Sequence, residues 1–127
     1  MIVLDASVLI AHLDARDAHH ERATQLLAGT GAEPLGASTI SLAETLVAPA
    51  RAGRLDEATD AIDQLGVVEL PLGVDASARL ARLRAETGRK LPDCCVLLSV
   101  QEHSGVVASF DATLIETAGG LGLATLT

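Results

Sequence analysis

The stretch MIVLDASVLI, residues 1–10, decides the fold, because a buried strand and a helix meet in it at one carboxylate. Residues 2–4 form an aliphatic run, which is typical of a strand covered on both faces in a parallel sheet. Asp5 follows directly, and apolar residues resume at Val8. Burying an unpaired carboxylate costs several kcal/mol. Asp5 therefore either caps the helix that follows or serves a function, and the stretch alone leaves both interpretations open.

Outward from this stretch, short aliphatic runs alternate with helical patterns, without an internal repeat or a linker. We expect strands at 2–5, 35–38, 67–70, 106–109 and 122–125, and helices at 7–14, 18–28, 40–52, 55–65, 75–87, 93–103 and 112–118. Strands that alternate with helices of this length predict an α/β fold with a mainly parallel sheet. At 127 residues the chain has the size of one domain, spanning 1–127.

The charge balance limits how the chain could bind nucleic acid. It has 17 acidic residues against 9 Lys and Arg, a formal net charge of −8. A protein that binds nucleic acid through its overall field is basic, so a broad, non-specific binder is disfavoured. Phe110 is the sole Phe, Tyr or Trp residue, which leaves no aromatic platform for bases. Nucleic-acid chemistry would need a local site at which metal ions offset the acidic charge.

The expected compartment is the cytoplasm. No apolar run reaches the roughly 18 residues that span a bilayer, and no basic segment precedes the first apolar stretch. The two cysteines, Cys94 and Cys95, are adjacent within an apolar run. Neighbours in a helix do not readily bridge each other, so they are expected to be reduced core thiols, which suits a reducing compartment.

A second aspartate, like Asp5, lies at the end of a predicted strand. Asp111 follows the predicted strand at 106–109, two residues after Ser109. The carboxyl ends of parallel strands lie at one edge of the sheet, where functional groups gather. Each aspartate also has an alternative explanation as a helix cap.

Two further acids stand on apolar helices. Glu44 lies on or beside the stripe predicted to be buried on its helix, which comprises Ile40, Ala43, Val47 and Ala50 and is widened by Leu42 and Leu46. A solvated glutamate would normally occupy the opposite face, although one at the stripe edge can also reach water.

Asp93 is the sole charge between Lys90 and Glu102, in the first turn of an otherwise apolar helix. The helix dipole favours an acid there by about 0.3–1 kcal/mol, which is a sufficient structural explanation. The alternative is that Asp93 marks the point at which a buried helix reaches a cleft.

Four carboxylates are thus attached to otherwise apolar elements: Asp5, Glu44, Asp93 and Asp111. If they converge, a cation must offset their repulsion. Oxygen ligands, without cysteine clips or spaced histidine pairs, favour Mg²⁺ or Mn²⁺ over Zn²⁺. Such an ion can activate water and neutralise charge on a phosphoryl group, which points to phosphodiester hydrolysis.

The segments around these acids, MIVLDASVLI, ISLAETL, LPDCCVLLSV and VVASFDATL, resemble those of the PIN-domain nucleases, most closely the VapC-type toxins of toxin–antitoxin pairs. The resemblance implies a three-layer α/β/α sandwich with about five strands and a Mg²⁺- or Mn²⁺-dependent endoribonuclease acting on RNA. It also implies a homodimer and a VapB-type antitoxin as partner. The residues implied as metal ligands are Asp5, Glu44, Asp93 and Asp111, with Ser7 and Ser109 as their supporting hydroxyls.

Other interpretations remain beside this one. Arg89, close to Asp93, is a candidate contact for an RNA phosphate, and a solvated helix end explains it equally. A haloacid-dehalogenase phosphatase would need a second Asp at the position of Ser7, and a phospho-receiver would need a lysine after Lys90. A PIN-fold nuclease that processes RNA without being a toxin, or a non-catalytic acidic metal-binding module, stays open.

Overall fold

The computed structural model describes residues 1–126, and in them every predicted strand and helix is present, with ends displaced by at most two residues. The strands are β1 (Ile2–Leu4), β2 (Leu35–Ser38), β3 (Val67–Leu70), β4 (Val106–Ala108) and β5 (Ala124–Leu126). The helices are α1 (Ala6–Leu13), α2 (His20–Ala28), α3 (Thr39–Arg51), α4 (Leu55–Gln64), α5 (Ala76–Thr87), α6 (Leu91–Glu102) and α7 (Ala112–Gly120).

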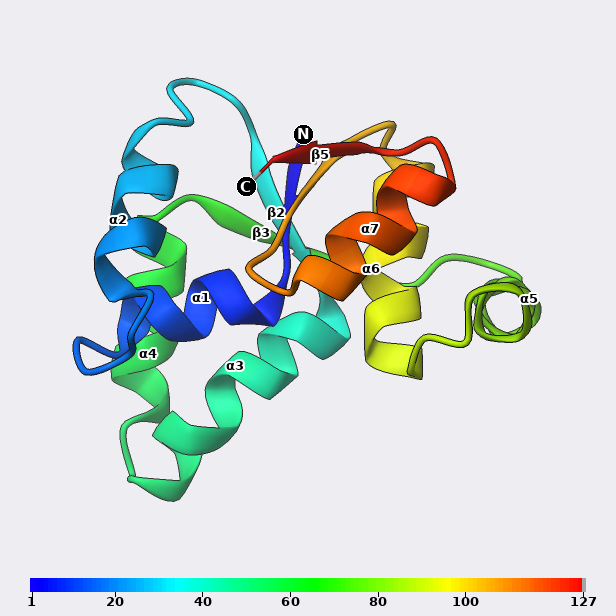
Figure 1. Ribbon diagram of the computed structural model, residues 1–127. Coiled ribbons are helices and arrows are strands. Elements are labelled where there is room, and N and C mark those ends of the chain that lie inside the picture. The colour runs from blue at the N-terminus through cyan, green and yellow to red at the C-terminus, as the bar shows by residue number, and fades with distance from the viewer. Residues whose placement is uncertain (127) are drawn as a thin grey trace.

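The five strands form one sheet in the order β3-β2-β1-β4-β5, and every pairing between them is parallel (Figure 1). β1 lies at the centre, where Ile2 is in register with Leu35 of β2 and Val106 of β4. The predicted α/β fold with a parallel sheet is confirmed.

Helices cover both faces of the sheet, which gives the three expected layers (Figure 1). Alternate side chains of a strand point to opposite faces, so Ile2 and Leu4 join the core beneath α1–α4. Val3 joins the second core, in which Leu97 of α6 and Leu114 of α7 are fully buried. A continuous aliphatic β1 is therefore required by two cores rather than one.

α3 buries only part of the face that its sequence predicts. Leu42 is buried and Leu46 packs against the core as expected, but Ala43 is exposed and Val47 is 44% exposed. Ser41 and Thr45 are buried instead. The Ser41 backbone N–H donates to Ser38 Oγ at 3.0 Å, and the Thr45 hydroxyl donates to the Ser41 carbonyl at 2.8 Å. The Ser41 hydroxyl accepts from the Ser38 hydroxyl at 3.1 Å, so both buried hydroxyls have a hydrogen-bond partner and their burial costs little.

Two smaller expectations can be compared with the same structure. Cys94 and Cys95 are buried free thiols, as predicted for core residues. Among residues 1–126, no helix is long and apolar enough to cross a bilayer.

Candidate functional site

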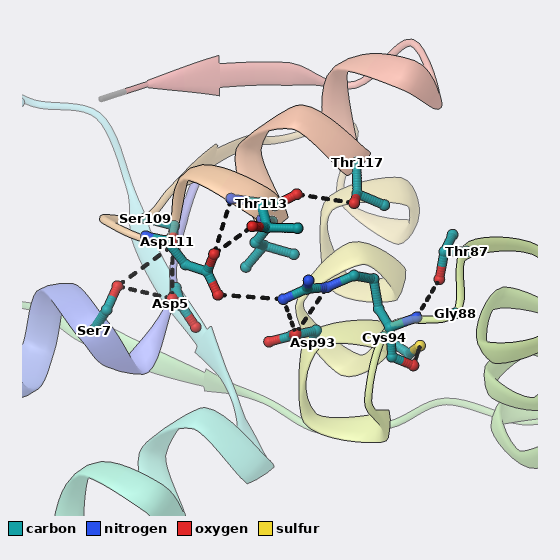
Figure 2. A network of polar contacts seen from close by, with 12 residues as sticks. Asp5, Ser7, Thr87, Gly88, Asp93, Cys94, Ser109, Asp111, Thr113 and Thr117 are labelled. Atoms are coloured by element: carbon teal, nitrogen blue, oxygen red, sulfur yellow. Dashed lines mark hydrogen bonds and ion pairs between the residues drawn. The ribbon is translucent and has the colours of Figure 1, made fainter.

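Asp5 lies where β1 ends and α1 begins, against the carboxyl end of β4. Its backbone N–H donates to the Ala108 carbonyl at 2.9 Å, which brings it beside Ser109. The carboxylate is 8% exposed. Its Oδ2 accepts a hydrogen bond from the Ser7 hydroxyl at 2.8 Å and another from the Ser109 hydroxyl at 2.7 Å (Figure 2). The side chain makes no capping bond to α1, so the capping interpretation of its carboxylate is wrong.

Backbone amides fix the direction of both hydroxyls. The Phe110 N–H donates to Ser7 Oγ at 3.0 Å, and the Asp111 N–H donates to Ser109 Oγ at 3.0 Å. Because each oxygen accepts from an amide, its own proton is available for Asp5. Within residues 1–126 both hydroxyls use the same carboxylate oxygen, so Oδ1 of Asp5 keeps its lone pairs for another ligand.

Asp111 combines two roles at the start of α7. Its Oδ1 accepts from the backbone N–H groups of Thr113 at 2.9 Å and Leu114 at 3.2 Å, as the capping interpretation predicts. Its Oδ2 accepts from Arg89 Nη2 at 3.2 Å. The cap therefore holds the second oxygen toward the same edge of the sheet as Asp5.

Asp93, in the first turn of α6, faces Asp111 (Figure 2). Its Oδ2 accepts from Nε of Arg89 at 3.0 Å and from Nη2 at 2.6 Å. The Arg89 guanidinium thus joins an acid on α6 to an acid before α7. It offsets a repulsion between two carboxylates that would otherwise be unpaired.

The turn between α5 and α6 places Arg89. Gly88 ends α5 with a φ of 70°, a left-handed conformation that side chains disfavour. The Arg89 N–H donates to the Thr87 hydroxyl at 3.1 Å. Arg84 Nη1 donates to the carbonyls of Gly88 at 2.9 Å and Arg89 at 2.8 Å. The backbone of Arg89 is therefore fixed, while its side chain reaches across to the acids.

Glu44 is an exposed residue of α3 whose carboxyl feels the charges of two of these acids. Partial burial, followed by the charges of Asp5 and Asp93, raises the pKa of Glu44 above its ordinary value. Its charged form is thus disfavoured by the two other acids. The four acids, defined as Asp5, Glu44, Asp93 and Asp111, therefore share one region at the carboxyl edge of the sheet.

The donor chemistry of this region suits a hard divalent cation, because the groups available are carboxylate oxygens. As the side chains stand, no group of three or more His, Cys, Asp or Glu residues among residues 1–126 is arranged to hold a metal ion. Arg89 instead provides the positive charge at two of the four acids. The residues fit a Mg²⁺ or Mn²⁺ site in kind, but two of them share their charge with the Arg89 guanidinium.

The ion pairs of Arg89 are the part of the site that sequence reasoning missed. Arg89 lies in the turn before α6, four residues before Asp93. Its closeness in sequence to that acid was the available signal. The contact with Asp111 spans 22 positions, and no local pattern reveals it.

Comparison with known proteins gives a consistent picture. The model of the PIN domain family matches residues 2–120. No curated protein matches the chain. Among solved structures, the chain is similar to VapC20 of Mycobacterium tuberculosis, described as a sarcin-ricin loop cleaving toxin, with 21% identity, 91% of this chain and 94% of that chain covered, and a TM-score of 0.75.

Two further structures extend the comparison. A toxin–antitoxin complex from Klebsiella pneumoniae has 21% identity and a TM-score of 0.78, with 100% of this chain and 97% of that chain covered. FitAcB from Neisseria gonorrhoeae has 23% identity and a TM-score of 0.74, with 100% and 97% covered. At these identities the likeness establishes a shared fold.

Proposed function

The chain belongs to the PIN-domain family, and from this premise we propose that it is a metal-dependent endoribonuclease acting as the toxin of a toxin–antitoxin pair. The observation that carries the proposal is the state of Asp5. Its buried carboxylate is held by two hydroxyls at the sheet edge and does not cap its helix. Three more acids converge on the same edge, a costly arrangement unless a cation binds there.

The four acids are the proposed ligands of Mg²⁺ or Mn²⁺. When bound, such an ion supplies an activated water and offsets the charge that builds on the phosphoryl group. The chain's own residues supply the orientation: Ser7 and Ser109 hold Asp5, and the α7 cap holds Asp111. Partners of this kind around metal ligands fix the geometry of the ligands themselves.

RNA is the proposed substrate, contacted locally rather than through the overall field of a chain whose net charge is −8. Arg89 lies at the acids and is the proposed contact for the RNA phosphate. A guanidinium pairs with phosphate through two parallel hydrogen bonds.

The proposed protein partners are a VapB-type antitoxin and a second copy of the chain. Similar structures include toxin–antitoxin complexes from other organisms. The buried thiols of Cys94 and Cys95 are consistent with the proposed cytoplasmic location.

The first experiment is cleavage of a structured RNA by the purified chain with Mg²⁺, with Mn²⁺ and with a chelator. Asp5→Asn and Asp93→Asn are measured alongside. We expect metal-dependent cleavage that falls by about 100-fold or more in both variants, while circular dichroism shows that they remain folded. Metal-independent cleavage, or full activity of folded Asp93→Asn, would contradict the proposed site.

A toxin is separated from a PIN-fold nuclease of RNA processing by a test in cells. Induced expression should arrest growth, and co-expression of a small DNA-binding protein encoded beside this chain should restore it. Growth unaffected by an active nuclease would favour the processing enzyme.

A further inference from the structure

Arg89 is paired with two of the four acids that are the proposed metal ligands. Its guanidinium bonds Asp93 Oδ2 through Nε at 3.0 Å and Nη2 at 2.6 Å, and Nη2 also reaches Asp111 Oδ2 at 3.2 Å. A divalent ion bound by the same two carboxylates would lie close to the guanidinium, and the two positive charges would repel each other. The site therefore has two competing positive occupants, one of which is part of the chain.

The ion pairs of Arg89 are placed so that they can open. The side chains of Arg89, Asp93 and Asp111 are 20%, 21% and 41% exposed, so water can replace the bonds that break. The pairs are part-buried, so solvent reaches their partners without screening them as fully as it screens a pair on the open surface. The backbone around Arg89, in contrast, is fixed by Thr87 and Arg84. Release would therefore move the side chain alone and leave the guanidinium beside the acids.

We propose that Arg89 is a movable counter-ion that exchanges between the acids and the substrate. In the metal-free protein it neutralises Asp93 and Asp111. A divalent cation displaces it from both carboxylates, and the released guanidinium then binds the RNA phosphate next to that cation. This inference rests on the proposed function and adds an order of events to it: the phosphate-binding group becomes free only when metal is present.

Competition predicts that loss of Arg89 strengthens metal binding. Calorimetric titration of Mn²⁺ into RNA-free protein compares the wild type with Arg89→Leu, Arg89→Lys and Arg82→Leu. Arg82 lies exposed on α5 and serves as a control with the same loss of charge. We expect Arg89→Leu to bind Mn²⁺ roughly fivefold or more tightly than the wild type, and Arg82→Leu to match the wild type.

Arg89→Lys separates direct competition from a general effect of charge. Lysine keeps the charge but lacks the planar fork that bonds a carboxylate through two nitrogens. We expect Arg89→Lys to bind Mn²⁺ with an affinity between those of the wild type and Arg89→Leu. Affinity equal to that of the wild type would show that charge alone acts. If Arg89→Leu does not fold, the comparison of Arg89→Lys with the wild type still tests the proposal.

The second measurement follows the released guanidinium. In saturating Mn²⁺, Arg89→Leu should cleave RNA with a raised KM and a less affected kcat, because it lacks the phosphate contact. Equal Mn²⁺ affinity in the wild type and Arg89→Leu would overturn the exchange and leave the proposed nuclease intact. If no protein in the series binds Mn²⁺, the proposed metal site itself is wrong.

Discussion

At the scale of single residues, Asp5 and Asp111 occupy equivalent positions in the fold but make different hydrogen bonds. Both follow a strand and precede a helix. Asp111 uses one oxygen to cap α7, whereas Asp5 accepts its hydrogen bonds from side chains of two separate segments. A capping carboxylate stabilises its own helix, but the Asp5 arrangement needs Ser109, which lies 104 positions away. That long-range support distinguishes Asp5 from an ordinary cap.

Loss of the Ser109 hydroxyl tests this support. Ser109→Ala should reduce RNA cleavage by about 10- to 100-fold, because residues that orient metal ligands typically have effects of this size. Ser99→Ala is the matched control, since Ser99 is also buried but bonds the Cys95 carbonyl within α6. Initial rates in Mn²⁺ and thermal melting are measured for both. Equal loss of activity in the two variants would point to a general packing effect.

Glu44 gives the site a pH dependence of stability in the metal-free protein. Its pKa is raised in the folded state by burial and by Asp5 and Asp93. The folded state therefore carries a penalty that is absent below the ordinary pKa of a glutamate and complete above the raised one. Glu44→Gln should increase the free energy of unfolding at neutral pH, in chelator, and the gain should vanish in acid. Urea unfolding at several pH values measures it, and a gain that does not change with pH would show that the Glu44 charge is not its source.

At the scale of elements, the capping bonds of α7 can be separated from the charge of Asp111. Asparagine caps helices about as well as aspartate, whereas alanine costs about 0.5–2 kcal/mol. Asp111→Asn should therefore retain most stability and lose most RNA cleavage, while Asp111→Ala should lose both. Urea unfolding and cleavage rates in Mn²⁺ distinguish the two variants. A fully active Asp111→Asn protein would limit Asp111 to its capping role.

The elements also show how far the sequence predicts this molecule. Aliphatic runs and helical periods locate all the strands and helices of residues 1–126, because each must bury apolar side chains. The buried face of α3 was predicted only in part. Leu42 is buried as expected, but Ser41 and Thr45 take the place of Ala43 and Val47, with their hydroxyls bonded to Ser38 Oγ and to the Ser41 carbonyl. A hydropathy scale scores serine and threonine as polar even where their hydrogen bonds are satisfied inside the protein, so it does not predict that they are buried.

The candidate site, too, could be predicted from the sequence only in part. The order of strands at a parallel sheet edge brings Asp5 and Asp111 together, and the sequence predicts that meeting. The Arg89 bridge depends on the path of the turn between α5 and α6, which Arg84 and Thr87 fix by contacts with the backbone. Such contacts have no periodic signature. The charges of a site are therefore easier to predict than the partners that neutralise them.

At the scale of the whole molecule, a cation that binds the folded state alone should stabilise it. The effect is about 2.7 kcal/mol at 100 times the dissociation constant, which for a chain of this size raises the melting temperature by several degrees. We expect Mg²⁺ or Mn²⁺ to raise it, and Asp93→Asn to reduce the rise. Sodium chloride at the same ionic strength is the control, because the net charge of −8 responds to any salt. An equal rise in sodium chloride would exclude specific binding.

The central place of β1 also bears on the synthesis of the chain. β1 precedes its partner β4, which comprises residues 106–108, so the ribosome must produce the hundred or so residues between them before the two can pair. Ser109 and Asp111 come later still. A copy whose translation stops before them has Asp5 without its distant hydroxyl and without the acid that precedes α7. We therefore expect such a copy to lack the proposed activity, because the proposed site assembles only after these residues are made.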